Sequence, residues 1–442
     1  MEIINLPKLF ELIFKRAPTS EEVATLQALY SRDPGPIRER IARLNEANVK
    51  NIVDNYYVGY NHDSIGDCGS VTLCIEDVSM LMAKAVQDWP LYNGQESSTR
   101  YIDFSRQAFI DPIGTPTSQA HLERWRAFYL KALKNTIEAI KAEHPLHEGA
   151  TEKEVADYPR TVKAKAFDIV RGFLPAGAST NLSWHSNMRQ TREKLVWLRN
   201  HPDTIMRRAA AEIQTVLVED FPYSGFDKIY EASEAYAQEW APQLLWNPTI
   251  IHHEPKMKTF LDDEVIAEHM ALLNHRPIRG PLPPFVGECG SIRFDYALDF
   301  ASFRDLQRHR NGVNRIPLLT NKLGFHSWYL SQLTEAIERE ALALLDSQKR
   351  ELDKFCDDEI TRQYYIPMGY IVPNRIQFPL QAIIYTLDLR TNQTVHATAR
   401  DVVIKMCKLF QKRLPEIKLH VDPSETSAFN MKRGGQTITE KT

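Results

Sequence analysis

The feature that most constrains this 442-residue chain is an internal repeat. Three short blocks recur in the second half in the same order: Gly66–Val71 as Gly287–Ile292, Leu174–Gly177 as Ile366–Gly369, and Trp197–Asn200 as Asp388–Thr391. The separations are 221, 192 and 191 positions, so the second copy is shorter between blocks. One short match arises easily by chance, whereas three in the same order indicate a duplication.

The repeat and the length together predict two domains, residues 1–240 and 241–442. In each half the sequence is first helical, then rich in strand-like stretches, and then helical again. The last helix of each half is amphipathic, at Met206–Val218 and Val395–Leu409. Strands followed by runs of helices favour an α+β fold over an alternating, doubly wound sheet.

Local patterns predict several elements. Residues 6–50 have helical spacing, with a capping signal at Thr19–Glu22. The glycine-rich stretch 59–71 predicts a loop, and Val71–Val78 has strand character. A second strand is expected at Thr249–Ile251, directly after the domain boundary.

Composition excludes several classes of protein. A net charge of −3 argues against a general nucleic-acid coat, and the short basic patches at Lys405–Arg413 and 431–435 are weak support for one. No run approaches the roughly 18 apolar residues that cross a bilayer, and the N-terminus does not resemble a signal peptide. Five scattered cysteines predict neither a disulfide framework nor a zinc site. We therefore expect a cytoplasmic protein with no metal, membrane or nucleic-acid partner.

Two polar segments, one in each half, are candidates for a shared site. Arg308-His309-Arg310, followed by Asn311, is a compact cluster of donors suited to phosphate and to an electron-rich ring. Glu96–Arg100 combines a carboxylate, hydroxyls and a guanidinium, and could hold a phosphate monoester. Taken singly, the first is more often a solvated surface face and the second a turn or a helix N-terminus.

Taken together, these blocks resemble the flavin-dependent thymidylate synthases. Members of that family carry an early loop with His-x-Ser/Thr and an acidic residue, then Arg-His-Arg, then Glu-x-Ser-x-Arg. Arg-x-x-Leu-Pro, Asn-x-Arg and Leu-Arg follow. Both halves look like degenerate copies, over most of residues 50–220 and 280–415. The resemblance implies two tandem copies of an α+β domain with an antiparallel sheet and long helices.

The two copies are degenerate in complementary ways. The first half keeps the early loop at His62, Ser64 and Asp67, Glu-x-Ser-x-Arg at Glu96, Ser98 and Arg100, Arg-x-x-Leu-Pro at Arg171, and Asn-x-Arg at Asn187 and Arg189. It has Asp88-Trp89-Pro90 in place of the Arg-His-Arg triplet. The second half keeps the triplet. It has Ile316, Leu318 and Thr320 in place of Glu-x-Ser-x-Arg, Gln363 in place of the arginine of Arg-x-x-Leu-Pro, and Pro379 and Gln381 in place of Asn-x-Arg. Both keep Leu-Arg. Family members are homotetramers with sites between subunits, so the resemblance implies a homodimer imitating that tetramer, with a phosphate half-site in the first domain and the Arg-His-Arg half-site in the second.

The resemblance also implies roles for individual residues. Deoxyuridine monophosphate (dUMP) would be bound by Glu96, Ser98, Thr99, Arg100, Arg171, Arg308 and Arg390, with Arg100 and Arg308 also catalytic. FAD would be contacted by His62, Ser64, Asn187, Arg189, His309, Arg310 and Asn311. Methylenetetrahydrofolate would supply the carbon and NADPH the reducing equivalents. Asp305 stands where a glutamine is expected near the base.

Alternatives within and outside this fold remain open. One is a different modification of a pyrimidine nucleotide at C5, such as hydroxymethylation. Another is a non-catalytic relative that binds flavin or nucleotide, or acts as a scaffold. Complementary retention of arginines favours an active site over a scaffold, because a scaffold has no reason to keep a divided set of charged groups.

Overall fold

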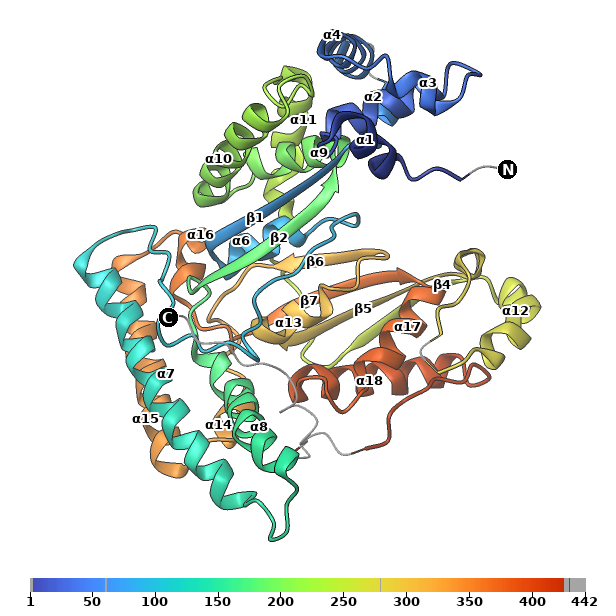
Figure 1. Ribbon diagram of the computed structural model, residues 1–442. Coiled ribbons are helices and arrows are strands. Elements are labelled where there is room, and N and C mark those ends of the chain that lie inside the picture. Colours follow the sequence, from blue (N-terminus) through green and yellow to red (C-terminus); the bar gives the residue numbers. More distant parts are fainter. Residues whose placement is uncertain (1–2, 60–61, 279, 425–428, 430–442) are drawn as a thin grey trace. The chain divides into compact units, whose positions relative to one another are not determined.

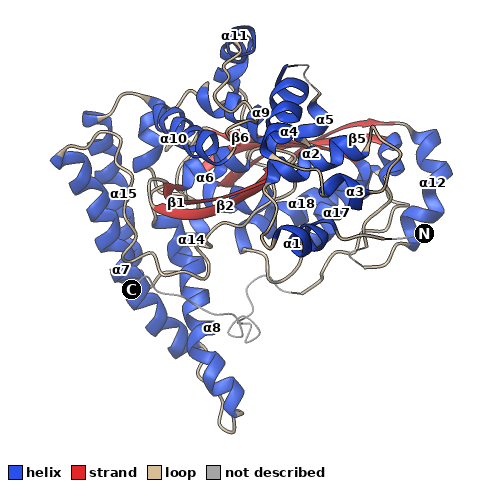
Figure 2. Ribbon diagram, turned by 45° about the horizontal axis from the view of Figure 1, so that its top comes forward, coloured by secondary structure: helices blue, strands red, loops and turns tan. Residues whose placement is uncertain are grey.

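The computed structural model describes residues 3–59, 62–278, 280–424 and 429. Helices dominate these residues (Figure 2). The α-helices are α1 Leu6–Phe14, α2 Ser20–Tyr30, α3 Ile37–Ile41, α4 Glu46–Lys50, α5 Asp63–Gly66, α6 Met80–Gln87, α7 Pro116–Glu143, α8 Glu152–Val170, α9 Met188–Arg199, α10 Thr204–Asp220, α11 Glu231–Trp240, α12 Asp263–His275, α13 Phe300–Leu306, α14 Ser327–Ser331, α15 Glu335–Phe355, α16 Glu359–Arg362, α17 Leu380–Arg390 and α18 Ala397–Arg413. A π-helix spans Asn51–Gly59, and short 3-10 helices include η2 Arg171–Phe173 and η5 Gln363–Tyr365.

The strands form two sheets. They are β1 Ser70–Ser79, β2 Ser179–Asn187, β3 Leu245–Trp246, β4 Lys256–Leu261, β5 Gly290–Asp299, β6 Val313–Pro317 and β7 Ile371–Pro379. β1 and β2 pair with each other, and the other five form a sheet of order β3-β6-β7-β5-β4. That sheet is antiparallel except where β3 joins β6, and its central register sets Asp299 opposite Ile371 and Ser291 opposite Pro379. The expected α+β class with an antiparallel sheet and long helices is confirmed.

Contacts divide the chain into two compact units that do not follow the sequence halves. Unit 1 contains the chain up to Glu76, with Leu91–Gln95 and Leu182–Leu244. Unit 2 contains Asp77–Pro90, Glu96–Asn181 and the chain from Leu245 onward. Unit 2 therefore takes large segments from both halves of the sequence. The predicted domain boundary between residues 240 and 241 separates the two sequence repeats. The two contact-based units are a different division of the chain, so this boundary stays a prediction.

The order of elements repeats along the chain (Figure 1). The first half runs β1–α6, then α7–α8–η2, then β2–α9–α10. The second runs β5–α13, then α15–α16–η5, then β7–α17–α18. The same succession of strand, helix, helical pair, strand and two helices occurs in both, which supports the duplication that the sequence blocks suggest.

The core of the second repeat lies between the five-stranded sheet and helices α17 and α18, which cover one of its faces (Figure 1). Phe294 and Ile376, on neighbouring strands, are almost fully buried against residues such as Ile383, Val403 and Phe410. Burial of such side chains contributes about 1.5–3 kcal/mol each. The amphipathic pattern predicted for the last helix of this half is thereby confirmed.

The long helices α7 and α15 lie side by side within unit 2. A capping box between Thr115 and Ser118 begins α7, and ion pairs such as Lys131–Glu340 cross between the two helices. Because the side chains of Lys131 and Glu340 are 53% and 41% exposed, this pair contributes little, and buried side chains such as Trp125 supply most of the packing energy. No helix in the described part of the chain is long and apolar enough to cross a membrane.

Most local predictions are confirmed. The helices within 6–50, the Thr19–Glu22 capping box and the strand near 71–78 are present. The loop predicted at 59–71 was partly wrong, because a one-turn helix, α5, interrupts it. The strand predicted at Thr249–Ile251 was wrong. Prolines before and after this stretch, at Pro248 and Pro255, remove backbone donors, and no partner strand pairs with it.

Candidate anion-binding site

Two strand-to-helix corners within unit 2 position the side chains of the site. At the end of β5, the Asp299 carboxylate accepts hydrogen bonds from the backbone N–H of Ser302 at 2.9 Å and from the Tyr329 hydroxyl at 2.7 Å. At the end of β1, Ser79 Oγ accepts from the backbone N–H of Met82 at 3.0 Å. By accepting these backbone N–H groups, Asp299 and Ser79 each cap the helix that follows. Helices α13 and α6 therefore begin at equivalent points of the two repeats.

Glu96 lies buried between α6 and α13. Its carboxylate accepts from Lys84 Nζ at 2.7 Å, from Arg304 Nη2 at 2.5 Å and from Gln87 Nε2 at 3.0 Å. Burial alone would raise the pKa of Glu96, but Arg304 and Lys84 outweigh it and lower the pKa to about 2. Arg304 also reaches the buried Thr99 hydroxyl, at 3.4 Å. The donors to the Glu96 carboxylate are side chains of α6 and α13, so the carboxylate links these two helices.

Arg100 is fixed in place by an aspartate of α8. Its Nε and Nη2 donate to the two Asp168 carboxylate oxygens at 2.6 and 3.0 Å, and Nη2 also donates to the Thr394 carbonyl at 3.1 Å. The backbone around Ser98 forms a turn, and Ser98 Oγ accepts from the Arg100 N–H at 3.3 Å. A bidentate pair of this kind orients the guanidinium strongly, so Arg100 has a defined direction before any ligand arrives.

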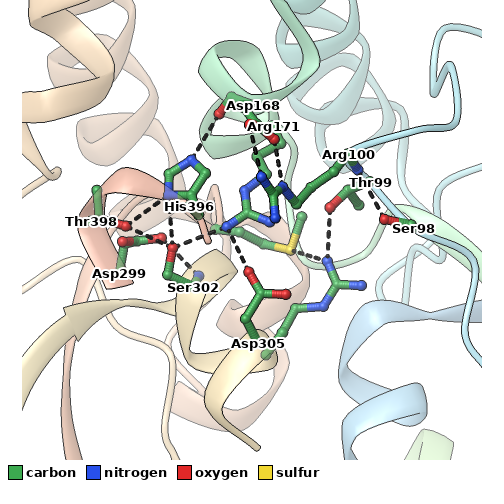
Figure 3. Close-up of polar contacts among 12 residues, drawn as sticks. Ser98, Thr99, Arg100, Asp168, Arg171, Asp299, Ser302, Asp305, His396 and Thr398 are labelled. Carbon is green, nitrogen blue, oxygen red and sulfur yellow. Dashed lines mark hydrogen bonds and ion pairs between the residues drawn. The ribbon is translucent and has the colours of Figure 1, made fainter. Parts of the chain in front are cut away.

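Arg171 follows one turn after Asp168 and points into the same cluster (Figure 3). Its side chain is 2% exposed, and Nη2 donates to Ser302 Oγ at 3.0 Å and to Asp305 at 3.3 Å. Its Nε has no hydrogen-bond partner among the described residues. A buried guanidinium N–H without a partner is costly.

His396 connects Arg171 to Arg100 through a chain of hydrogen bonds (Figure 3). Its Nδ1 lies 3.1 Å from Ser302 Oγ and 2.9 Å from Thr398 Oγ1, and its Nε2 lies 3.1 Å from the Asp168 carbonyl. Burial, assisted by Arg171, lowers the pKa of His396 to about 3, so the ring is neutral. Nε2–H then donates to the carbonyl, and Nδ1 accepts from the hydroxyls.

His309, in the middle of the basic triplet, orients a further arginine. Arg390 Nε donates to His309 Nε2 at 2.7 Å, so the ring proton is on Nδ1, which lies 3.2 Å from Thr386 Oγ1. Burial and the neighbouring arginines lower the pKa of His309 well below its usual value. Both ring nitrogens are engaged, so the His309 contact with flavin expected from the sequence would have to use the ring face or edge. That role stays a prediction.

The rest of the triplet lies nearer the surface. Arg308 and Asn311 are exposed, and Arg310 is half-buried. Arg308 makes no hydrogen bond or ion pair with any part of the chain that the structure describes, so all its N–H groups are available to a ligand.

The four arginines predicted to bind substrate all influence the charge of one carboxylate, that of Asp305. Burial alone would raise the pKa of Asp305, but Arg171, Arg100, Arg308 and Arg390 lower it far below its usual value. Arg100 and Arg171 come from the first half of the sequence, and Arg308 and Arg390 from the second. Within unit 2, Arg171 of the first half pairs with Asp305 of the second at 3.3 Å, and Arg100 donates to the Thr394 carbonyl at 3.1 Å. Segments that the sequence analysis assigned to separate half-sites therefore contact each other.

The remaining predicted residues belong to unit 1. Asn187 caps α9, and its Nδ2 donates to Asp67 at 2.9 Å. Arg189 Nε donates to the same carboxylate at 2.8 Å. His62 Nδ1 is 2.8 Å from an N–H of an arginine that follows α2, and Ser64 is exposed in α5. Asp67 thus accepts hydrogen bonds from two of the four residues of this unit that are predicted to contact flavin.

Several residues of the cluster could not be found from motifs. Asp168, Ser302 and His396 shape the site, yet none stood out as a ligand in the sequence. The spacing of Asp168 and Arg171, three residues apart at a helix end, is a weak signal that both face one side. Lys84 and Arg304 carry no motif, and their burial follows from packing alone.

Comparison with known proteins identifies a matching family and several relatives. Residues 12–223 match the family described as thymidylate synthase complementing protein. The chain is 24% identical to a UPF0159 protein of Chlamydia muridarum over 87% of this chain and 82% of the relative. It is 22% identical to one of Chlamydia pneumoniae, over 90% and 85%, and 23% identical to one of Thermoplasma acidophilum, over 86% and 91%.

The structure is that of an α+β protein with a cluster of buried arginines in unit 2. The sequence match is more specific, because residues 12–223 match the thymidylate synthase complementing family, which is the family of flavin-dependent thymidylate synthases. The resemblance noted in the sequence is confirmed, and it supports a thymidylate synthase-like role.

Proposed function

We propose that the protein transfers a one-carbon unit to C5 of dUMP, with FAD as cofactor and methylenetetrahydrofolate and NADPH as co-substrates. The observation that carries this proposal is the contact between the two half-sites: Arg171 pairs with Asp305 at 3.3 Å, and Arg100 donates to the Thr394 carbonyl at 3.1 Å. Arg308 and Arg390 also lower the pKa of Asp305. A degenerate relative without function has no reason to retain these four guanidinium groups, two from each repeat.

The nucleotide phosphate is held, on this proposal, by donors that the protein leaves available. Within the described parts of the chain, Arg308 makes no hydrogen bond, and the Arg390 side chain makes one, from Nε to His309. Ser98 adds a hydroxyl on the turn that precedes Arg100. Several donors converging on three oxygens are the usual way in which proteins bind a phosphate monoester.

Arginine also stabilises negative charge that develops on a pyrimidine ring attacked at its C5–C6 bond. A guanidinium directed at a uracil carbonyl oxygen, in a buried site, favours the charged transition state over the neutral substrate. Because His309 is neutral, it orients Arg390 without adding a charge of its own, and Thr386 fixes the ring in turn. The protein contributes orientation and electrostatics here, and no protein nucleophile is required.

The residues assigned to FAD have side chains that suit such a ligand. In unit 2, Arg310 and Asn311 carry guanidinium and amide N–H groups, the donor types that bind the diphosphate of a dinucleotide. Arg189 and Asn187 of unit 1 carry groups of the same kind. A reduced flavin, when bound, supplies the reducing equivalents for the transfer. We further propose a cytoplasmic homodimer that imitates the family's tetramer, with no nucleic-acid, membrane or metal partner.

The test is the visible absorption spectrum of the purified protein before and after addition of FAD and then dUMP. Flavin bands that shift when dUMP is added would support a shared pocket, and tritium release from dUMP labelled at C5 would then show the reaction. Tritium release with a product other than dTMP would point to a different C5 modification, such as hydroxymethylation. A protein that takes up no flavin would overturn the proposal in favour of a non-catalytic relative.

A further inference from the structure

The loop of residues 391–396, which joins α17 to α18, contributes two contacts to the site in unit 2. The Thr394 carbonyl accepts a hydrogen bond from Arg100 Nη2 at 3.1 Å. His396 Nε2 lies 3.1 Å from the Asp168 carbonyl (Figure 3). The position of this loop therefore helps to set the direction of the Arg100 guanidinium.

The loop is held both by its own residues and by a segment that follows α18. Asn392 Oδ1 accepts from the N–H and from the hydroxyl of Thr394, each at 3.0 Å. The second anchor is Asp422. Its Oδ2 accepts from the Gln393 N–H at 3.1 Å, and its own N–H donates to Thr391 Oγ1 at 3.3 Å. Asp422 thus contacts the loop on either side of Asn392.

The segment 414–424 that carries Asp422 is itself fixed in place. Three of its apolar side chains are buried in the core that α17 and α18 share with the five-stranded sheet: Leu414, Ile417 and Leu419. Arg400 of α18 is 1% exposed and joins the segment to the loop. Its Nη2 donates to the Asp422 carbonyl at 2.9 Å, and its Nε donates to the Thr391 carbonyl at 2.6 Å. Asp422 is therefore a fixed point against which the loop is held.

We propose that Asp422 is a positioning residue of the nucleotide site. By holding the loop 391–396 it keeps the Thr394 carbonyl on Arg100, so the guanidinium is fixed by Asp168 on one side and by the loop on the other. A donor that is already oriented loses less freedom when a phosphate binds, and the affinity is higher for that reason. Asp422 acts through the loop and not by contact with the ligand. The inference rests on the proposed function, since it concerns the same site.

Asp422→Ala in the full-length protein tests the inference with two measurements. Hydrogen–deuterium exchange reports on the loop without any ligand, and we expect the backbone amides of residues 391–396 to exchange about tenfold faster, with α15 unchanged. Titration calorimetry with dUMP and with inorganic phosphate reports on the site. We expect both ligands to bind about five- to tenfold more weakly, the factor that corresponds to one hydrogen bond.

Two further variants serve as controls. Asp422→Asn keeps an oxygen that can accept from the Gln393 N–H, so it should restore most of the affinity and of the protection from exchange. Asp401→Ala removes one negative charge from the surface of α18, where the Asp401 side chain is 63% exposed and pairs with Lys405. Its ligand affinities should equal those of the wild type. An equal loss of affinity in Asp401→Ala would overturn the inference, because net charge alone would then account for it.

A double-mutant cycle separates positioning from a general structural role. If Asp422 acts through Arg100, adding Asp422→Ala to Arg100→Ala should cause no further loss of phosphate affinity. The same five- to tenfold loss in both backgrounds would show that Asp422 does not act through Arg100 and would overturn the inference. Arg100→Gln takes the place of Arg100→Ala if the alanine variant does not fold.

The two ligands distinguish failure of this inference from failure of the proposed function. Weaker binding of inorganic phosphate by Asp422→Ala, in a protein that does not bind dUMP, would support the positioning role while the proposed function failed. Unchanged exchange of the loop would overturn the inference, and so would faster exchange with unchanged phosphate affinity. Wild-type protein that binds neither ligand would overturn it as well, since there would be no site to position.

Discussion

Pro175 and Pro367, 192 positions apart in the sequence, lie opposite each other in an antiparallel bridge within unit 2. The hydrogen bonds around them are reciprocal. The N–H of Ala176 donates to the Ile366 carbonyl at 3.0 Å, and the N–H of Met368 donates to the Leu174 carbonyl at 2.9 Å. The two matching blocks of the sequence thus contact each other through equivalent atoms, as expected for two repeats related by a local two-fold axis.

The first prediction concerns the two halves of the chain. Unit 2 draws on both halves, so a fragment ending at residue 240 or beginning at 241 lacks part of a core and exposes apolar surface. Each fragment alone should aggregate or remain partly unfolded, whereas the two expressed together should assemble. Size-exclusion chromatography and circular dichroism of the fragments, alone and together, provide the measurement. A soluble, cooperatively unfolding first half would contradict the interleaved arrangement.

The second prediction concerns Glu96→Ala. Removing this carboxylate leaves Lys84 and Arg304 buried without a counter-charge, which typically costs about 3–5 kcal/mol. We expect a loss of this size in the free energy of unfolding, measured by urea denaturation. Glu340→Ala is the matched control, because its pair with Lys131 is exposed and should contribute less than about 1 kcal/mol. Similar small losses in both variants would refute the role assigned to Glu96.

The third prediction separates binding from stability within the arginine cluster. Arg308→Ala removes a guanidinium that is exposed and makes no hydrogen bond with the described residues, so unfolding should change by less than about 0.5 kcal/mol. Binding of dUMP should nevertheless weaken by about 1.5–3 kcal/mol, the usual contribution of a hydrogen bond to a charged group.

Arg100→Ala provides the contrast. It should weaken dUMP binding by a similar amount and also destabilise the fold, because Asp168 loses its bidentate partner. Arg350→Ala, on the surface of α15, serves as a control for loss of a positive charge. Equal dUMP affinity in wild type and Arg308→Ala would remove Arg308 from the pocket.

The sequence was informative where chemistry is carried by short motifs. The blocks around Pro175 and Pro367 predicted the repeat, and the arginines of two separate motifs, Arg100 and Arg308, were expected in one site. The α+β class followed from the order of strand-like and helical stretches in each half.

The sequence was uninformative where tertiary packing decides a residue's role. The sequence did not indicate that the Glu96 carboxylate accepts hydrogen bonds from Lys84 and Arg304. Nor did it indicate that both ring nitrogens of His309 are engaged by residues of α17. The substrate role of Glu96 and the flavin role of His309 stay predictions. No local pattern encodes which donors reach a given side chain across 80 or 200 positions.

The last prediction is a pH dependence that originates at His396. Its pKa in the folded protein is about 3, below the ordinary value of 6.5, because burial disfavours the charged ring. The unfolded chain therefore takes up a proton below pH 6.5 while the folded protein does not. The stabilisation from the neutral ring is complete above pH 6.5 and is lost as the pH falls toward 3, at about 1.4 kcal/mol per pH unit.

Replacement by an uncharged side chain removes this dependence. The difference in unfolding free energy between wild type and His396→Gln should shrink by about 2–3 kcal/mol between pH 7.5 and pH 4.5. Urea denaturation at half-unit intervals of pH measures it, with His147→Gln, an exposed histidine, as the control that should follow the wild type throughout. A difference that stays constant with pH would mean that the folded protein binds a proton at His396, and that the link from Ser302 through His396 to Asp168 does not require the neutral ring.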